Sequence, residues 1–264
     1  MLMIDTHCHA GRNWFEPIET LEFQMDRCGV TGAVLIQHGG TYDNDYLFDA
    51  AARRPGRFKV VVLVDPTSAD PLGDLTRLAE SGAAGVRLSL RMQFGTPHGH
   101  DIWKKAGELG LVVSSLGKAA EFASEEFKRI VEACPDTRIV IEHLAGVGVT
   151  KPPYGEFASA LENPRSPNTA IKIPGLAKIC PRPPILEPEF RFENVPPLFE
   201  MAREAFGVQR MMWGSNFPPS AGYEGYQNTL EGVRDHPAFG GDEDSAWVMG
   251  KTAARWWGFD EGGG

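Results

Sequence analysis

Three observations predict that this chain folds as a single α/β domain, a (β/α)8 barrel. Its 264 residues match the size that is typical of that fold. Short apolar runs rich in Val and Ile recur along the chain, which is the pattern of parallel strands buried on both faces. Amphipathic stretches separate these runs and predict helices that cover the sheet. An open, doubly wound sheet is the alternative architecture.

The predicted strands are eight short apolar runs. In chain order they are 2–7, 32–37, 59–65, 84–90, 111–115, 138–142, 169–173 and 210–214. Between them, apolar residues at intervals of three and four among charges predict helices, most clearly at 17–28 and 121–134.

Two remaining segments are predicted as long loops at the mouth of the barrel, where such folds place specificity. They are 150–166 and the proline-rich stretch 180–197. No linker divides the chain. We therefore expect residues 1–260 to form one domain and 261–264 to be a disordered tail.

The composition narrows the class of partner. The formal net charge is −9 and the pI is near 5.3, so no excess of Lys and Arg is available to neutralise nucleic acid or an acidic membrane surface. We therefore expect a small-molecule substrate. The four cysteines form no CxxC pair, and the chain has neither a signal-like N-terminus nor an apolar run that could cross a bilayer. These features predict a cytoplasmic protein and leave open whether it is a homo-oligomer.

The segment Asp5-Thr6-His7-Cys8-His9 ends the first predicted strand. Because alternate side chains of a strand share a face, we expect Asp5, His7 and His9 to point into the barrel. Two imidazoles there could hold a divalent metal or polarise a carbonyl. His143 follows the sixth predicted strand and is expected at the same end of the barrel, whereas its neighbour Glu142 is expected to face away from the site.

Four segments, two of which contain these histidines, resemble motifs of a known family. IDTHCHA, IVIEHLAG, AIKIPGL and MMWGSNFP are similar to strands 1, 6, 7 and 8 of the amidohydrolase-related (amidohydrolase family 2) metal-dependent hydrolases, which are TIM barrels. The resemblance implies that His7 and His9 are ligands of a divalent metal, with zinc the first candidate. The chain departs from the family at its fifth strand, where Ser114 and Ser115 stand and no His, and at Asn216, where the family has Asp.

The first departure is shared with a lactonase-like branch of that family, which also lacks the His of the fifth strand. The sixth strand of that branch is similar to EHLAG. Members of that branch that work without metal use their histidines to polarise a lactone carbonyl. The resemblance therefore leaves two possibilities open, a bound zinc ion or a site that works without metal. The second departure removes a base, because a neutral amide cannot take a proton from water. His143 is then the candidate base, with Asn216 positioning the water.

Three cations could receive an anionic substrate. Arg87 and Arg91 lie in and after the fourth predicted strand, and Lys172 lies in the seventh. Guanidinium suits bidentate carboxylate binding, so we predict that these residues bind a substrate carboxylate. The alternative is that each pairs with a carboxylate of the protein.

Together the residues and the resemblance predict a hydrolase that acts on a small carboxylated compound such as a lactone. A metal-dependent decarboxylase of an aromatic or unsaturated acid is the alternative enzyme. A binding protein without turnover is the alternative outside catalysis, motivated by the two departures at strands 5 and 8.

Overall fold

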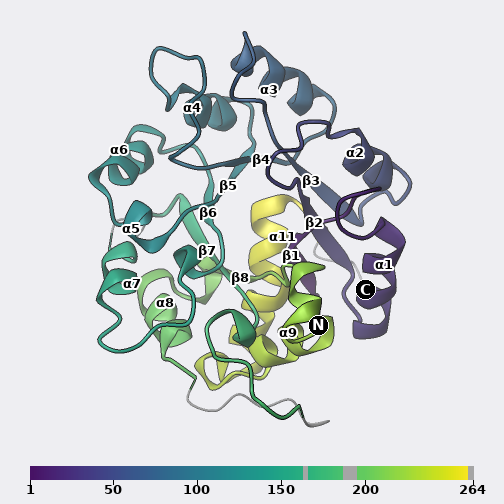
Figure 1. The fold of residues 1–264 in the computed structure, drawn as a ribbon, viewed down its shortest axis with the longest axis vertical. Helices are drawn as coiled ribbons and strands as arrows, with labels where there is room; N and C mark the ends of the chain where they lie inside the picture. The colour runs from purple at the N-terminus through teal and green to yellow at the C-terminus, as the bar shows by residue number, and fades with distance from the viewer. Residues whose placement is uncertain (163–165, 187–194, 261–264) are drawn as a thin grey trace.

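The protein, as a computed structural model, is described over residues 1–162, 166–186 and 195–260. Within them, eight parallel strands follow one another around a barrel in chain order (Figure 1). The strands are β1 (Ile4–Cys8), β2 (Gly32–Ile36), β3 (Phe58–Val62), β4 (Gly85–Leu88), β5 (Val112–Ser115), β6 (Ile139–Ile141), β7 (Thr169–Ile173) and β8 (Met211–Trp213). The predicted (β/α)8 barrel is confirmed.

The first and last strands meet through the residues that follow β8. Asn216 N donates to His7 O, and His9 N donates to Phe217 O, both at 2.8 Å. Cys8 and Phe217 form an isolated parallel bridge. The barrel therefore closes at the level of His7 and His9, which ties the two histidines to the segment that carries Asn216.

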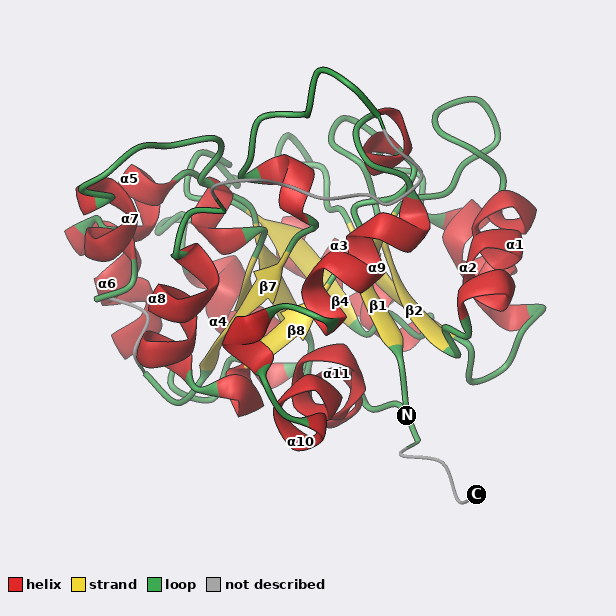
Figure 2. Ribbon diagram, turned by 90° about the horizontal axis from the view of Figure 1, so that it is seen from below, coloured by secondary structure: helices red, strands yellow, loops and turns green. Residues whose placement is uncertain are grey.

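Helices surround the strands (Figures 1 and 2). They are α1 (Ile18–Cys28), α2 (Asp45–Ala52), α3 (Pro71–Glu80), α4 (Asp101–Glu108), α5 (Ala119–Phe122), α6 (Glu125–Ala133), α7 (Gly155–Ala160), α8 (Leu198–Phe206), α9 (Tyr226–Arg234), α10 (Asp242–Ala246) and α11 (Thr252–Trp257), the last two joined by a π-helical stretch, Trp247–Lys251. Their apolar faces pack against outward-facing strand residues to form the larger core.

One helix prediction is confirmed, and one helix prediction and one loop prediction are corrected. The helix predicted at 17–28 is α1. The one predicted at 121–134 is two helices, since Ser124 between them is extended and its side chain caps α6 by accepting from Phe127 N. The loop predicted at 150–166 contains α7, which is too short for its periodicity to stand out. In the loop predicted at 180–197, residues 187–194 lie outside the described ranges, as does the predicted tail 261–264.

Helix α11 closes one end of the barrel interior, and we call this closed end the floor. Inward-facing apolar residues of the strands, Val34 and Val140 among them, form one cluster with Ala253, Trp256 and Trp257 of α11. Figure 2 shows α11 lying across the end of the barrel at which the strands begin. The opposite end, where the strands finish, is left as the mouth, and the polar residues described next lie there.

Candidate active site

Three imidazoles converge at the mouth of the barrel. The ring centroid of His7, in β1, lies 5.0 Å from that of His9 and 4.2 Å from that of His143. All three side chains are buried. Burial is the main cause that lowers the pKa of each, to about 4 for His9 and about 3 for His143. Each ring is therefore neutral near pH 7 and offers one N–H donor and one lone pair.

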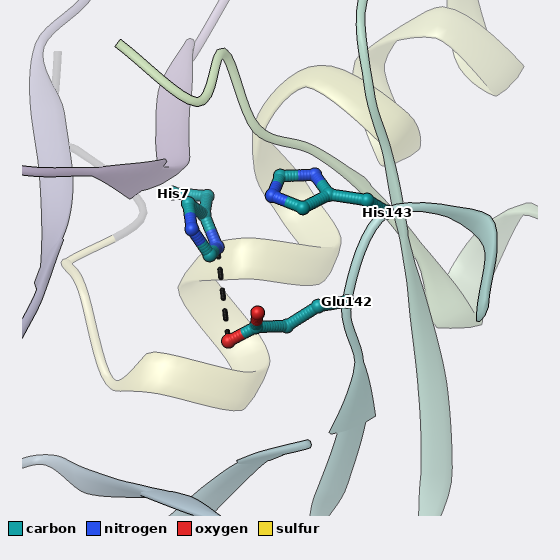
Figure 3. A group of neighbouring side chains, drawn as sticks. All are labelled: His7, Glu142 and His143. Carbon is teal, nitrogen blue, oxygen red and sulfur yellow. Dashed lines mark ion pairs between the residues drawn. The ribbon is translucent and has the colours of Figure 1, made fainter. Parts of the chain in front are cut away.

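Glu142 lies in the site, so the prediction that it faces away is wrong. After β6 the backbone takes positive φ angles at three consecutive non-glycine residues, 46° at His143, 50° at Leu144 and 56° at Ala145. Such angles are costly for L-residues and turn the chain sharply. The strand alternation ends there, and both Glu142 and His143 face His7 (Figure 3).

Glu142 forms a buried ion pair with Arg87. Arg87 Nη2 lies 2.7 Å from Glu142 Oε2, Arg87 Nε lies 3.0 Å from Oε1, and Ser114 Oγ donates to Oε1 at 2.8 Å. Burial alone would raise the pKa of Glu142, but the positive charges of Arg87 and Lys172 outweigh it and lower that pKa to about 2. Both oxygens of the carboxylate are thus engaged, and so is the guanidinium that was predicted to bind substrate.

Lys172 lies inside the barrel beneath His7. Its Nζ is 2.9 Å from Ser114 Oγ, 3.2 Å from His7 Nδ1 and 5.6 Å from the centre of the Trp257 ring below it. The side chain is fully buried. Burial is the main cause that lowers the pKa of Lys172, to about 8, so the ammonium form still dominates at neutral pH. Its contacts are with the protein itself, which favours a supporting role over substrate binding.

Several buried nitrogens have no protein partner. Among the described residues, neither His7 Nε2 nor either ring nitrogen of His143 makes a hydrogen bond. Buried polar atoms are rarely left so, and clusters of them indicate a place for a ligand, an ion or water. His9 differs, because its Nδ1 lies 2.7 Å from Ile36 O.

One group of the described residues could hold a metal ion. Ligand atoms of His7, Glu142 and His143 all lie within 4.8 Å of one another (Figure 3). The free nitrogens fit such an ion, and the group includes His7 of the predicted pair but not His9. An ion there would compete with Arg87 and Ser114 for Glu142.

Two cavities flank His143. The first, of about 320 Å³, brings together the cations Arg91, Lys118 and Lys178. Arg91 is exposed and its Nε donates to Glu121 Oε1 at 2.6 Å, so this predicted substrate contact lies at the rim and already has a partner.

The second cavity, of about 300 Å³, contains Asn216 and Glu224 together with His143. Glu224 precedes α9 and is buried, and its Oε2 accepts from Ala177 N at 3.0 Å. Burial raises the pKa of Glu224 to about 7. Glu224 could not be predicted as a site residue, because no sequence motif surrounds it and only the three-dimensional structure shows its burial.

The Asp5 prediction is also corrected. A register shift between Asp5 and Cys8 interrupts the β1–β2 ladder. Asp5 accepts hydrogen bonds from the backbone and hydroxyl of Ser215, whereas His7 contacts Lys172 inside the barrel. An irregularity of this kind moves the following side chains to the other face, so Asp5 and His7 do not share one.

This geometry is that of an enzyme on an α/β barrel, and comparison with known proteins gives its family. The amidohydrolase family model matches residues 4–259. The chain therefore belongs to the amidohydrolase family. Among the described residues, no helix has the length and apolar character needed to cross a membrane.

Individual relatives resemble the chain over most of its length. An L-fucono-1,5-lactonase of Burkholderia ambifaria is 27% identical over 245 residues, which cover 82% of this chain and 80% of that protein. A Pseudomonas putida protein assigned as a 2-pyrone-4,6-dicarboxylic acid hydrolase is 22% identical, with a TM-score of 0.74 and 99% of both chains covered. A zinc-bound amidohydrolase of Burkholderia multivorans is 16% identical, with a TM-score of 0.79 over 98% of this chain and 100% of its own.

Proposed function

We propose that the protein hydrolyses a small carboxylated lactone. The observation that carries this proposal is the set of three neutral imidazoles at the mouth, with His7 Nε2 and both nitrogens of His143 free of protein partners. A cavity that brings together Arg91, Lys118 and Lys178 adjoins His143. Similarity to an L-fucono-1,5-lactonase and to a protein assigned as a pyrone dicarboxylic acid hydrolase supports the choice of lactone.

The histidines suit polarisation of a carbonyl. Water attack on a lactone places negative charge on the carbonyl oxygen, and a fixed N–H donor in a buried site stabilises that charge strongly. His7 is held from below by Lys172, and its free Nε2 is the atom that we assign to the oxyanion.

Proton removal from the attacking water is assigned to the cavity that holds Asn216. The amide of Asn216 orients water but cannot accept the proton. His143 is the base that the sequence predicts, although a pKa of about 3 makes it a weak one. Glu224 lies in the same cavity, and its pKa of about 7 is better matched to neutral pH.

The carboxylate of the substrate is assigned to the first cavity. Arg91, Lys118 and Lys178 line it together with Glu121 and Glu142. Glu142 is already paired with Arg87, so the three cations outweigh the remaining carboxylate and favour an anion there despite the negative charge of the whole chain. Arg87 is paired with Glu142, so it contributes only its positive charge and makes no direct contact with the substrate.

Zinc is the divalent ion that we propose for His7, Glu142 and His143, because imidazole and carboxylate are its usual ligands in catalytic sites. A bound zinc ion would supply a Lewis acid for the carbonyl in place of the Nε2–H donor of His7. We propose that it binds weakly, since both oxygens of Glu142 already have partners. A cytoplasmic location is also proposed, and it is supported by four cysteines that are all free in the described structure.

The test is turnover of pyrone carboxylates, followed by acid release and product identification, with and without added zinc. Aldonolactones, which lack a carboxylate, are the comparison and should be turned over less efficiently. We expect ring opening without loss of CO2, and at least ~100-fold lower kcat/KM for His7→Asn and His143→Asn. His98→Asn, at an exposed loop position, is the matched control. Release of CO2 would instead identify a decarboxylase, and tight binding without turnover would identify a binding protein.

A further inference from the structure

The hydrogen bonds around Lys172 have a definite direction. An ammonium group has three donors and no acceptor. Ser114 Oγ donates its single proton to Glu142 Oε1, so it accepts from Lys172 Nζ at 2.9 Å. The second contact of Nζ is His7 Nδ1 at 3.2 Å. Because Lys172 can only donate in this arrangement, His7 Nδ1 must present its lone pair.

A neutral imidazole with its lone pair at Nδ1 carries its proton at Nε2. Glu142 Oε1 could accept a proton from Nδ1 instead, but it lies 3.9 Å away, which is beyond hydrogen-bonding distance. A doubly protonated His7 does not compete, because its Nδ1–H would point at the Lys172 ammonium, which has no lone pair to accept it.

We propose that Lys172 is a positioning residue that fixes His7 in the Nε2–H tautomer and so makes it a hydrogen-bond donor toward the mouth of the barrel. The use of that donor on a carbonyl oxygen rests on the proposed function, whereas the tautomer itself does not. The ammonium also brings a positive charge next to the ring, which strengthens Nε2–H as a donor.

His9 has the opposite arrangement. Ile36 O can only accept, so His9 Nδ1, 2.7 Å away, carries the proton and Nε2 has the lone pair. The two histidines of the first strand thus present one donor and one acceptor. A metal-binding pair would present two lone pairs, and a metal at His7 Nε2 requires the tautomer that Lys172 opposes. The contact of Lys172 with His7 therefore also supports the weak metal binding proposed above.

Histidine tautomers can be measured directly. In the metal-free wild-type protein labelled with 15N-histidine, two-bond 1H–15N spectra at pH 7 should show His7 as Nε2–H and His9 as Nδ1–H, with His7→Asn used to assign the signals. His7 as Nδ1–H would overturn the proposal, whether or not any lactone is hydrolysed. Absence of hydrolysis together with His7 as Nε2–H would uphold the proposal and reject the function.

Lys172→Met tests the coupling to metal. It removes the donor and its charge and keeps a long side chain over Trp257. We expect His7 to lose its fixed tautomer, zinc affinity to rise at least about tenfold in a chelator competition, and kcat to fall more than KM changes. Unchanged zinc affinity in the folded variant would contradict the proposal. If Lys172→Met does not fold, the wild-type spectrum still decides the tautomer.

Lys59→Met is the matched control for that variant. Lys59 also lies in a barrel strand, β3, and its Nζ is 5.4 Å from the centre of the Phe259 ring, but none of its contacts involves His7. This control should leave the tautomer and the zinc affinity unchanged. A rise equal to that of Lys172→Met would mean that lost positive charge alone explains the effect, and the proposal would fail.

Discussion

Replacing Glu224 by Gln should change how the stability of the protein depends on pH. The side chain is 8% exposed, and its Oε2 accepts from Ala177 N. Gly175 makes room for it, because a Cβ there would lie 2.0 Å from Glu224 Oε1. Gln keeps the shape and an accepting oxygen but cannot ionise, so the substitution isolates the cost of burying the charge.

The size of the effect follows from the pKa. Burial raises the pKa of Glu224 from 4.5 to about 7, which corresponds to about 3 kcal/mol. The folded protein binds this proton more tightly than the unfolded chain. The stabilisation by protonation is therefore complete below pH 4.5 and is lost as the pH rises through 7.

The assay is urea unfolding of wild type and Glu224→Gln between pH 4 and 8. We expect the variant to gain about 3 kcal/mol relative to wild type across that interval. Glu156→Gln removes an exposed carboxylate of α7 and is the charge-matched control. Parallel curves for wild type and Glu224→Gln would refute the reasoning. If Glu224 is also the base, kcat should fall in the variant while its stability rises.

Three further substitutions test the rest of the site. Arg87→Met leaves Glu142 buried without its main counter-charge, and should lower the unfolding free energy by about 3 to 5 kcal/mol in urea titration; a loss below about 1 kcal/mol would mean that Lys172 is a sufficient partner. Arg91→Ala should raise KM for a carboxylated lactone roughly fivefold at unchanged kcat, and equal KM values would remove Arg91 from the substrate site. Asn216→Asp should raise zinc affinity about tenfold and alter the pH profile of kcat, whereas identical profiles and metal content would place Asn216 outside the chemistry.

The barrel could be predicted from the sequence because its signal is repeated. Each strand is a short run buried on both faces, and eight such runs in order leave few other architectures. The positions of His7, His9 and His143 at the mouth follow from the same repetition, since the ends of parallel strands meet around one axis.

The misplaced residues share a local cause. The rule that side chains alternate holds only while the strand is regular, and it fails for Asp5, where β1 shifts register, and for Glu142, where the chain turns through positive φ angles. The register shift in β1 has no glycine, and in the turn after β6 glycine stands only at Gly146, after three non-glycine residues that already have positive φ. Lys172 was predicted in the correct strand. Its burial inside the barrel could not be predicted, because the Trp257 ring beneath it belongs to α11, which lies far along the chain.

The floor beneath Lys172 has a consequence for biosynthesis. Trp256 and Trp257 belong to α11, which the ribosome makes after all eight strands. Until α11 packs against the strands, the interior of the nascent barrel stays open to water at that end, and the Lys172 ammonium remains hydrated. The environment that orients His7 is therefore completed last, so a chain interrupted before α11 would carry every catalytic candidate named above and still lack the organised site.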